Sequence, residues 1–241
     1  MEEGSPGPLP VKSINVVFCG ESSVGKTSIV CRYTLDEYKN EKDATVGMEH
    51  FIWNGLPRHI SDVKYEIKLN IWDGGGKEHY RNSLRKLHSM ADVLCFTFDL
   101  TNTDTLDAVT SHWLETTRWT LNGRTWGNHE RRLPVIAYLI GSKSDLVEQR
   151  KITYEMGKQI AESHGMKYFE TSAKNNQGLF ELFDDIIEYA HGQAIVGRDP
   201  GYNFEIPSKT MDDDTPVTYR EYHYYRWWCC CRNSDSLFIE E

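Results

Sequence analysis

The sequence has few basic residues and no long apolar run, and these two deficits exclude whole classes of protein. Its 241 residues carry 27 Lys and Arg against 36 Asp and Glu, a formal net charge of -9. Nucleic acid is therefore not expected as the main partner, because binding a phosphate backbone needs a broad basic face. No apolar run approaches the roughly 18 residues that a membrane-spanning helix requires. Residues 1–10 are acidic and proline-rich, unlike a signal or transit peptide, so we expect a cytoplasmic protein.

Paired-cysteine and metal-ligand patterns are also lacking. Cys19, Cys31 and Cys95 stand in apolar or helical contexts without C-x-x-C spacing. We expect buried, reduced thiols there rather than disulfides or zinc ligands. The histidines show no ligand spacing, so no metal-binding role is assigned to them.

From Ser13 to about His191, strand-type segments alternate with helix-type segments, which predicts a mostly parallel sheet covered by helices on both faces. Near-continuous apolar runs, typical of buried central strands, cover residues 14–18, 93–98 and 135–140. Residues 63–72 alternate, and we expect them to pair with residues 50–53 as a hairpin at one edge. Helices are expected after Gly25 and over residues 105–120, 153–164 and 179–189, with Trp113 and Trp119 as packing residues.

This alternation ends near Gly192, where the composition shifts to glycine, proline and aspartate. We therefore expect a flexible N-terminus over residues 1–12, a folded domain over residues 13–192 and a flexible C-terminal extension over residues 193–241. The extension closes with aromatic residues beside Cys229, Cys230 and Cys231.

A complete phosphate-binding motif, G-x-x-x-x-G-K-[ST], follows the first apolar run as Gly20-Glu21-Ser22-Ser23-Val24-Gly25-Lys26-Thr27. Its glycines let successive N–H groups turn toward an anion, Lys26 reaches the β- and γ-phosphates, and the Thr27 hydroxyl can ligate Mg²⁺. A helix beginning near Ser28 would point its N-terminus at the same phosphates. Nucleoside triphosphate binding is therefore the first hypothesis.

Further motifs follow later strands. Asp73 is placed to hold Mg²⁺ through water, and Gly76 lies where the backbone can approach the γ-phosphate. In Ser142-Lys143-Ser144-Asp145, the Asp145 carboxylate can accept from two N–H donors on a guanine edge, so this motif selects the base. Backbone N–H groups of Ser172, Ala173 and Lys174 can bind the guanine carbonyl oxygen.

In this order the motifs resemble those of the Ras superfamily of small GTPases, and of its Rab-like group, over roughly residues 11–189. Asp43–Phe51 looks like switch I of that family, and Trp72–Arg81 resembles switch II. The resemblance implies an α/β fold of the Ras-like P-loop NTPase type, with a mostly parallel six-stranded sheet and residues 13–192 as the GTP-binding domain. It also implies that Thr45 ligates Mg²⁺ and contacts the γ-phosphate, and that the Tyr38 ring packs on the guanine.

The same resemblance implies a GTP/GDP-dependent molecular switch with Mg²⁺ as cofactor, acting in vesicle trafficking or related signalling. Switch loops held by the γ-phosphate relax on hydrolysis, which is how such proteins signal. Effectors are expected at Thr45–Phe51 and Trp72–Arg81, with an exchange factor and a GTPase-activating protein as further partners. The metal would be held by Thr27, Thr45 and, through water, Asp73, and the catalytic set would be Lys26, Thr45, Gly76 and Lys77.

Two positions depart from the family pattern. Lys77 stands where a glutamine normally orients the attacking water. Because lysine has donors only and cannot accept a proton from water, we expect slow intrinsic hydrolysis, or a nucleotide-bound adaptor that does not hydrolyse GTP. Ser142 replaces the usual Asn, and its hydroxyl can keep one hydrogen bond between the base loop and the phosphate loop.

A P-loop ATPase or kinase, which would prefer ATP, is a third hypothesis.

The C-terminus also departs from the Rab pattern of prenylated cysteines close to the chain end. Ten residues follow Cys231, and no C-a-a-X box is present. Aromatic and arginine side chains suit a membrane interface, and S-palmitoylation of Cys229, Cys230 or Cys231 would supply acyl chains. The alternatives are peripheral attachment to an endomembrane or the plasma membrane and a free, disordered tail.

We expect Lys77→Gln to raise the single-turnover rate constant of GTP hydrolysis by on the order of 10²-fold, because it restores a group that positions water. GTP affinity, measured on the same two proteins, serves as the control and should stay unchanged. A wild-type rate that is already fast and that the substitution leaves alone would contradict this interpretation of Lys77.

Overall fold

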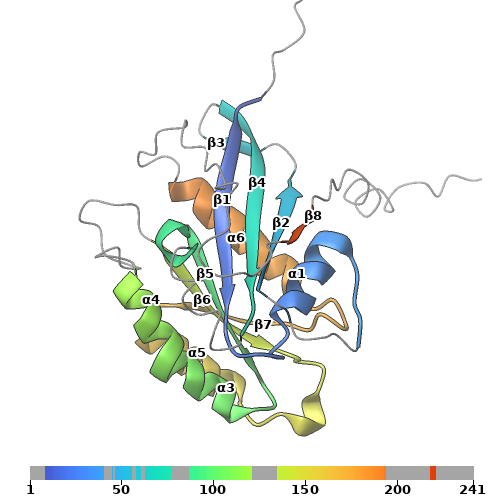
Figure 1. The fold of residues 1–241 in the computed structure, drawn as a ribbon, viewed down its shortest axis with the longest axis vertical. Coiled ribbons are helices and arrows are strands. Elements are labelled where there is room, and N and C mark those ends of the chain that lie inside the picture. The colour runs from blue at the N-terminus through green and yellow to red at the C-terminus, as the bar shows by residue number, and fades with distance from the viewer. Residues whose placement is uncertain are drawn as a thin grey trace, which may run out of the picture.

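The computed structural model describes residues 9–40, 45, 47–55, 58–60, 63–76, 87–120, 135–193 and 218–220. Its strands form a sheet in the order β7-β6-β5-β1-β4-β2-β8, with β3 paired to β4 outside that path (Figure 1). Both β2 and β3 run antiparallel to β4, whereas the other pairs are parallel. The strands are Val11–Cys19 (β1), Met48–Asn54 (β2), Arg58–Ile60 (β3), Val63–Gly74 (β4), Val93–Asp99 (β5), Ile136–Ser142 (β6), Lys167–Glu170 (β7) and Thr218–Arg220 (β8).

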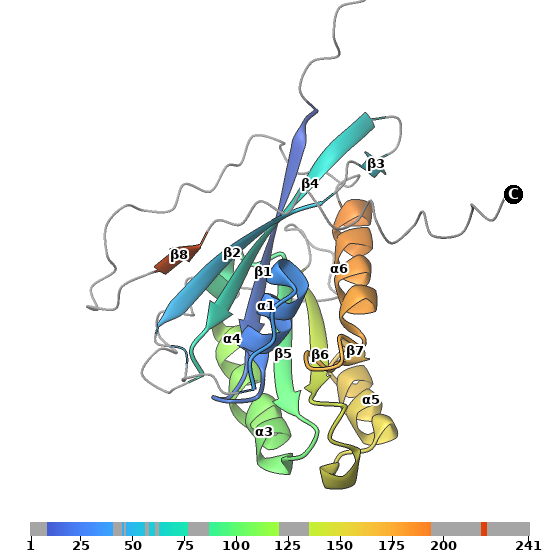
Figure 2. The ribbon, with the colours of Figure 1, turned by 90° about the vertical axis from the view of Figure 1, so that its right-hand side faces the viewer.

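The predicted α/β fold class is confirmed. The mostly parallel sheet is built from six main strands, β1, β2, β4, β5, β6 and β7, and helices flank it on both sides (Figure 2). The two further strands, β3 and β8, have three residues each. β8 pairs with β2 in parallel, from Glu49 with Thr218 to Phe51 with Arg220. The β2–β4 pair that was expected at the edge of the sheet therefore has one more short strand beside it.

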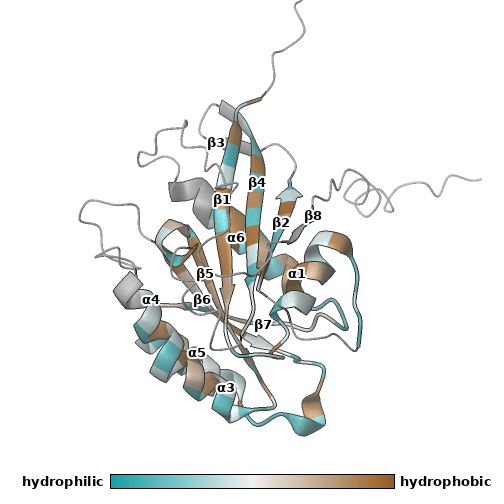
Figure 3. Ribbon diagram, in the orientation of Figure 1, coloured by the Kyte–Doolittle hydropathy of each residue, from teal (hydrophilic) through white to brown (hydrophobic). Residues whose placement is uncertain are grey.

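The helices form two layers, and a hydrophobic core lies under each. α1 (Lys26–Leu35) and α6 (Leu179–Gln193) pack on one face, and α3 (Thr103–Ala108), α4 (Leu114–Thr120) and α5 (Tyr154–Ser163) pack on the other (Figures 1 and 2). β1 supplies Ile14, Val16 and Phe18 to the first core and Val17 and Cys19 to the second. Burial on both faces explains why the second half of β1, from Val16 to Cys19, is continuously apolar and why β5 is almost so (Figure 3).

The helix predicted over residues 105–120 is present but contains an irregular turn. A π-helical turn, η2 (Val109–Trp113), joins α3 to α4, and the N–H of Leu114 donates to the carbonyl of Val109, five residues earlier. Trp113 is buried as predicted, with 1% of its surface exposed. The helix expected at residues 153–164 is α5, and the Thr153 hydroxyl accepts from the N–H of Met156 at 3.3 Å. A short 3-10 helix, Val147–Gln149, precedes it.

A buried polar chain crosses the core beneath α3 and α4. His88 is fully buried; its Nε2 lies 3.1 Å from Cys19 Sγ and its Nδ1 lies 3.3 Å from Thr117 Oγ1. Burial lowers the pKa of His88 to about 4 and raises the pKa of the Cys19 thiol to about 12, so both groups are neutral. Cys19, Cys31 and Cys95 are buried thiols, as predicted. Within the described part of the chain, no helix has the length and apolar character to cross a bilayer.

The free energy of unfolding should fall as the pH drops from about 6.5 toward 4, because the unfolded chain binds a proton at His88 that the folded protein rejects. A pKa lowered from 6.5 to about 4 corresponds to about 3 kcal/mol over that interval. His50, whose pKa burial also lowers to about 4, contributes in the same direction. Urea unfolding at pH 7 and pH 4.5 measures the change.

The variant His88→Asn should lose part of this pH dependence, and His112→Asn, at a partly exposed histidine, serves as the matched control. If His88→Asn and His112→Asn show the same pH dependence as the wild type, His88 does not stay neutral in the folded protein.

Candidate functional site

The carboxyl ends of β1, β4, β5 and β6 meet at one edge of the sheet, and a cavity of about 810 Å³ opens there. Residues from five separate motifs of the sequence share its lining. Most residues predicted to bind nucleotide are among them: Ser22, Ser23, Gly25, Lys26, Thr27, Ser28, Tyr38, Thr45, Gly76, Ser142, Lys143, Asp145, Ala173 and Lys174. The lining also includes four residues that the motifs did not indicate, Ile29, Lys39, Asn40 and Leu146.

The phosphate loop joins β1 to α1 through backbone of positive φ, with φ 140° at Gly20, 65° at Ser23 and 98° at Gly25. Turns of this kind direct successive N–H groups into one concavity, which attracts anions. Gly25 is the N-cap of α1, and no side chain caps the N–H groups of the first turn. These donors are therefore available to a ligand in the cavity.

Two glycines let backbone approach backbone around this loop. A Cβ on Gly20 would lie 2.2 Å from the carbonyl oxygen of Thr97 on β5. A Cβ on Gly76 would lie 2.3 Å from both the Glu21 carbonyl carbon and the Ser22 nitrogen. The segment after β4 therefore sits directly against the phosphate loop, and a side chain at position 76 would separate the two.

The Lys26 side chain is fixed by hydrogen bonds to the backbone of its own loop. Its Nζ donates to the carbonyl of Gly20 at 2.9 Å and to the carbonyl of Glu21 at 2.7 Å, and only 5% of the residue is exposed. Burial lowers the pKa of Lys26, while the charge of Asp73 opposes that shift. The ammonium group is thus fixed at the loop, facing the carbonyl groups next to the predicted phosphate positions.

Three oxygen-bearing side chains from separate segments meet at the start of α1. Thr27 Oγ1 lies 2.8 Å from Thr45 Oγ1 and donates a hydrogen bond to Asp73 Oδ2. Asp73, at the end of β4, is fully buried. Hydroxyl and carboxylate oxygens are the ligands that Mg²⁺ prefers, and Mg²⁺ sites usually combine a few protein ligands with water. The donor set therefore fits the Mg²⁺ ion that the sequence predicts here.

The opposite end of the cavity is built around Asp145. The Ser172 hydroxyl donates to Asp145 Oδ1 at 2.7 Å, and Ser172 Oγ accepts from the Asn175 N–H at 3.0 Å. The N–H of Ser144 donates to the carbonyl of Thr171 at 3.1 Å. Because a carboxylate offers about four lone pairs, Asp145 keeps acceptor capacity for a base after accepting from Ser172.

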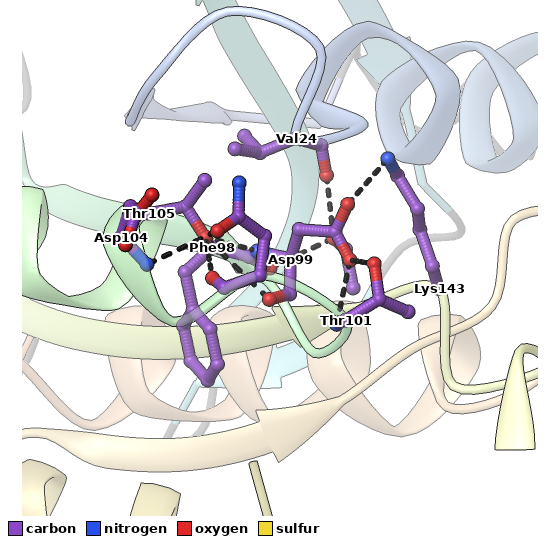
Figure 4. A network of polar contacts seen from close by, with 9 residues as sticks. Val24, Phe98, Asp99, Thr101, Asp104, Thr105 and Lys143 are labelled. Atoms are coloured by element: carbon purple, nitrogen blue, oxygen red, sulfur yellow. Dashed lines mark hydrogen bonds and ion pairs between the residues drawn. The ribbon is translucent and has the colours of Figure 1, made fainter. Parts of the chain in front are cut away.

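Ser142 links this base loop to the phosphate loop, the bond that was expected of its hydroxyl. Its Oγ contacts the carbonyl of Val24 and lies 2.7 Å from the carbonyl oxygen of Phe98. Beside it, Lys143 Nζ donates to Asp99 Oδ2 at 2.6 Å, and Thr101 donates to the other oxygen of Asp99 from both its N–H and its hydroxyl (Figure 4).

The sequence did not indicate a role for Arg32, which ties α1 to the base loop. Its Nε donates to the carbonyl of Ala173 at 2.8 Å and its Nη2 to the carbonyl of Lys174 at 3.2 Å. The guanidinium carbon also lies 5.9 Å from the centre of the Tyr38 ring. Asp99 was likewise missed, because a lone Asp at a strand end carries no motif.

Several predicted residues fall outside the part of the chain that the structure describes. These are Lys77, residues 43, 44 and 46 of switch I, residues 77–81 of switch II, including Tyr80 and Arg81, and the cysteines Cys229, Cys230 and Cys231. Their predicted roles stay predictions.

Comparison with protein-family models matches residues 15–191 to the model described as the Ras family. The match covers more than half of the chain and spans the phosphate loop, β2, β4 and both base-binding segments.

We expect Gly76→Ala to lower affinity for a nucleoside triphosphate by about tenfold or more, the loss that follows from removing one hydrogen bond to a charged group. The added Cβ must push the segment after β4 off Glu21 and Ser22, and so away from the third phosphate. Titration with fluorescent GTP and GDP analogues measures the change. GDP, which lacks that phosphate, is the internal control, and an equal loss for both nucleotides would contradict the assignment of Gly76.

Proposed function

Because this chain belongs to the Ras family, we propose that it is a Rab-like guanine-nucleotide switch whose GTP-binding domain spans residues 13–192. Ras-family proteins are small GTPases that bind GTP and GDP with Mg²⁺ and interact with effectors, exchange factors and GTPase-activating proteins. The observation that supports the proposal is the gathering of five motifs around one cavity. Asp145, which accepts a hydrogen bond from Ser172, lines it, and so do Thr45 and Thr27, which donates to Asp73.

In this proposal different residues bind different parts of the nucleotide. N–H groups of Gly20–Ser28 hold the β- and γ-phosphates, and Lys26 exchanges its bonds to loop carbonyls for bonds to phosphate oxygens. Asp145 accepts the two N–H donors of the guanine edge, and backbone N–H groups of Ser172, Ala173 and Lys174 donate to its carbonyl oxygen. Ser142 and Lys143 tie the base loop down, and Tyr38 covers the ring.

Hydrolysis is phosphoryl transfer to water. Thr27 and Thr45 would hold Mg²⁺ directly and Asp73 through water, and the ion, when bound, neutralises charge on the transferred phosphoryl group. Thr45, in switch I, would sense the γ-phosphate because its hydroxyl lies beside Thr27 at the metal position, and Gly76 would do so through its approach to the phosphate loop. Lys26 stabilises the developing negative charge at the bridging oxygens.

The chain is expected to differ from its family in the rate of GTP hydrolysis. Lys77 offers donors and no acceptor, so intrinsic hydrolysis is slow and the triphosphate state is long-lived. The second candidate function, a hydrolysis-deficient adaptor that stays bound to nucleotide, rests on the same residue.

We further propose effector binding through Thr45–Phe51 and Trp72–Arg81 and a role in vesicle trafficking or related signalling. The protein would be cytoplasmic and attached peripherally to an endomembrane or the plasma membrane through acylated Cys229, Cys230 or Cys231. The aromatic and arginine side chains around these cysteines support this attachment.

Competition of GTP and ATP for the purified protein tests the base assignment, and we expect GTP to bind far more tightly. Asp145→Asn should weaken GTP binding by about 100-fold, because the amide loses the charged acceptor for two N–H donors. The same variant should gain affinity for xanthosine triphosphate, whose extra carbonyl can accept from the new amide. Asp104→Asn, at an exposed position on α3, is the matched control. Tighter binding of ATP than of GTP would refute the guanine assignment.

A further inference from the structure

A buried tryptophan from the far helical layer is bonded to the phosphate loop. Trp113 Nε1 donates to Glu21 Oε1 at 3.0 Å, across 92 positions of sequence. The indole is 1% exposed and packs in the core beneath α3 and α4, together with Val17 and Cys19 of β1. Glu21, the second residue of the loop, is only partly buried.

The π-helical turn η2 determines the direction in which the Trp113 indole leaves the helix. Trp113 is the last residue of the turn, and the N–H of Leu114 reaches back five residues to Val109 instead of four. The turn adds one residue to the helix, so Trp113 and the residues after it are rotated relative to α3. Such turns are rare and are frequently found at functional sites.

Glu21 is also a point of contact for two parts of the site. Its carbonyl accepts from Lys26 Nζ at 2.7 Å, and its carbonyl carbon is one of the two atoms closest to the position that a Cβ on Gly76 would take. Burial lowers the pKa of Lys26, and the negative charge of Asp73 and, to a smaller extent, that of Glu21 oppose this shift. The carboxylate is therefore close enough to influence the group that faces the phosphates.

The side chain of Glu21 is nevertheless kept out of the cavity. Its neighbours Ser22 and Ser23 line the cavity, as do most residues from Gly25 to Ile29, whereas Glu21 does not. A carboxylate free to turn into that space would pair with Lys26 and repel the phosphates, since both carry negative charge. The hydrogen bond from Trp113 holds it toward the core instead.

We propose that Trp113 is a positioning residue for nucleotide binding, which holds the Glu21 carboxylate out of the phosphate site. The inference rests on the proposed function, because the ligand that it protects is the guanine nucleotide. It gives the helix on the opposite side of the sheet from α1 a direct connection to the phosphate loop. A change in the conformation of α3 and α4 would then alter nucleotide release without touching the nucleotide.

The test is a double-mutant cycle on the full-length protein. Trp113→Phe removes the donor and keeps an aromatic ring in the core, and Glu21→Gln removes the charge and keeps an oxygen that can accept from the indole. Dissociation of a fluorescent GDP analogue in Mg²⁺ buffer is timed for the wild type, both single variants and the double variant. Tyr138→Phe is the matched control, because it removes a buried donor 2.6 Å from the Asp185 carboxylate in the other core.

We expect Trp113→Phe to speed GDP release about tenfold, the effect of losing one charge-assisted hydrogen bond. In the Glu21→Gln background the same change should have less than about a twofold effect, because no charge remains to be misplaced. The tenfold effect should also shrink as salt is added, since the repulsion is electrostatic. Tyr138→Phe should leave release unchanged.

Equal acceleration by Trp113→Phe in both backgrounds, or by Tyr138→Phe as well, would overturn the proposal in favour of a packing role. The proposal would also be overturned if Trp113→Phe did not speed GDP release in the otherwise wild-type protein, which keeps Glu21. If the proposed guanine-nucleotide function is wrong, the wild-type protein itself binds no guanine nucleotide, and this result is distinct from the outcomes above. The proposal for Trp113 is then overturned as well. Thermal unfolding of each variant shows that all four proteins are folded.

Discussion

The position of β1 between β4 and β5, with all three strands running in the same direction, is the constraint on which the rest of the structure depends. The register pairs Phe18 of β1 with Asp73 of β4 and with Cys95 of β5. Because parallel strands end at the same edge, the loop after β1 emerges beside Asp73 and beside the carbonyl of Thr97, which Gly20 packs against. A shift of one residue would turn the alternating side chains of β1 to the wrong core and break the contact between Thr27 and Asp73.

The features that depend on neighbouring residues could be predicted from the sequence. The phosphate loop is one of them, because the spacing of its glycines, lysine and threonine determines its shape locally. The fold class followed from the apolar runs, which are long where a strand is buried on both faces. Strand bounds were less accurate: β1 begins at Val11 rather than at Ile14, because Lys12 and Ser13 also join the ladder with β4 although both are polar. Hydrogen bonding along the ladder extends a strand beyond its apolar core.

The contacts that cross the molecule could not be predicted. Arg32 meets the carbonyl of Ala173 across 141 positions, and no local pattern says which carbonyl group a guanidinium will reach. The same holds for Trp113, whose helical spacing from Trp119 indicated packing and whose single polar atom donates to Glu21. The π-helical turn was not predicted either, because one inserted residue changes the helical period too little to be seen. The motifs thus predicted most of the groups that line the cavity, whereas the contacts that support them are seen only in the three-dimensional structure.

Ser142 has a consequence for how tightly the two halves of the site are joined. Its hydroxyl carries one proton, yet two carbonyl oxygens, those of Val24 and Phe98, lie within reach. The hydroxyl is therefore a rotor with two positions, and in each of them one carbonyl receives nothing from it. A carboxamide at this place, with two N–H donors, could serve two acceptors at once. The hydroxyl therefore joins the base loop to the phosphate loop less firmly than a carboxamide would, and in the proposed function more of the nucleotide binding depends on Asp145, Lys26 and the predicted metal ligands.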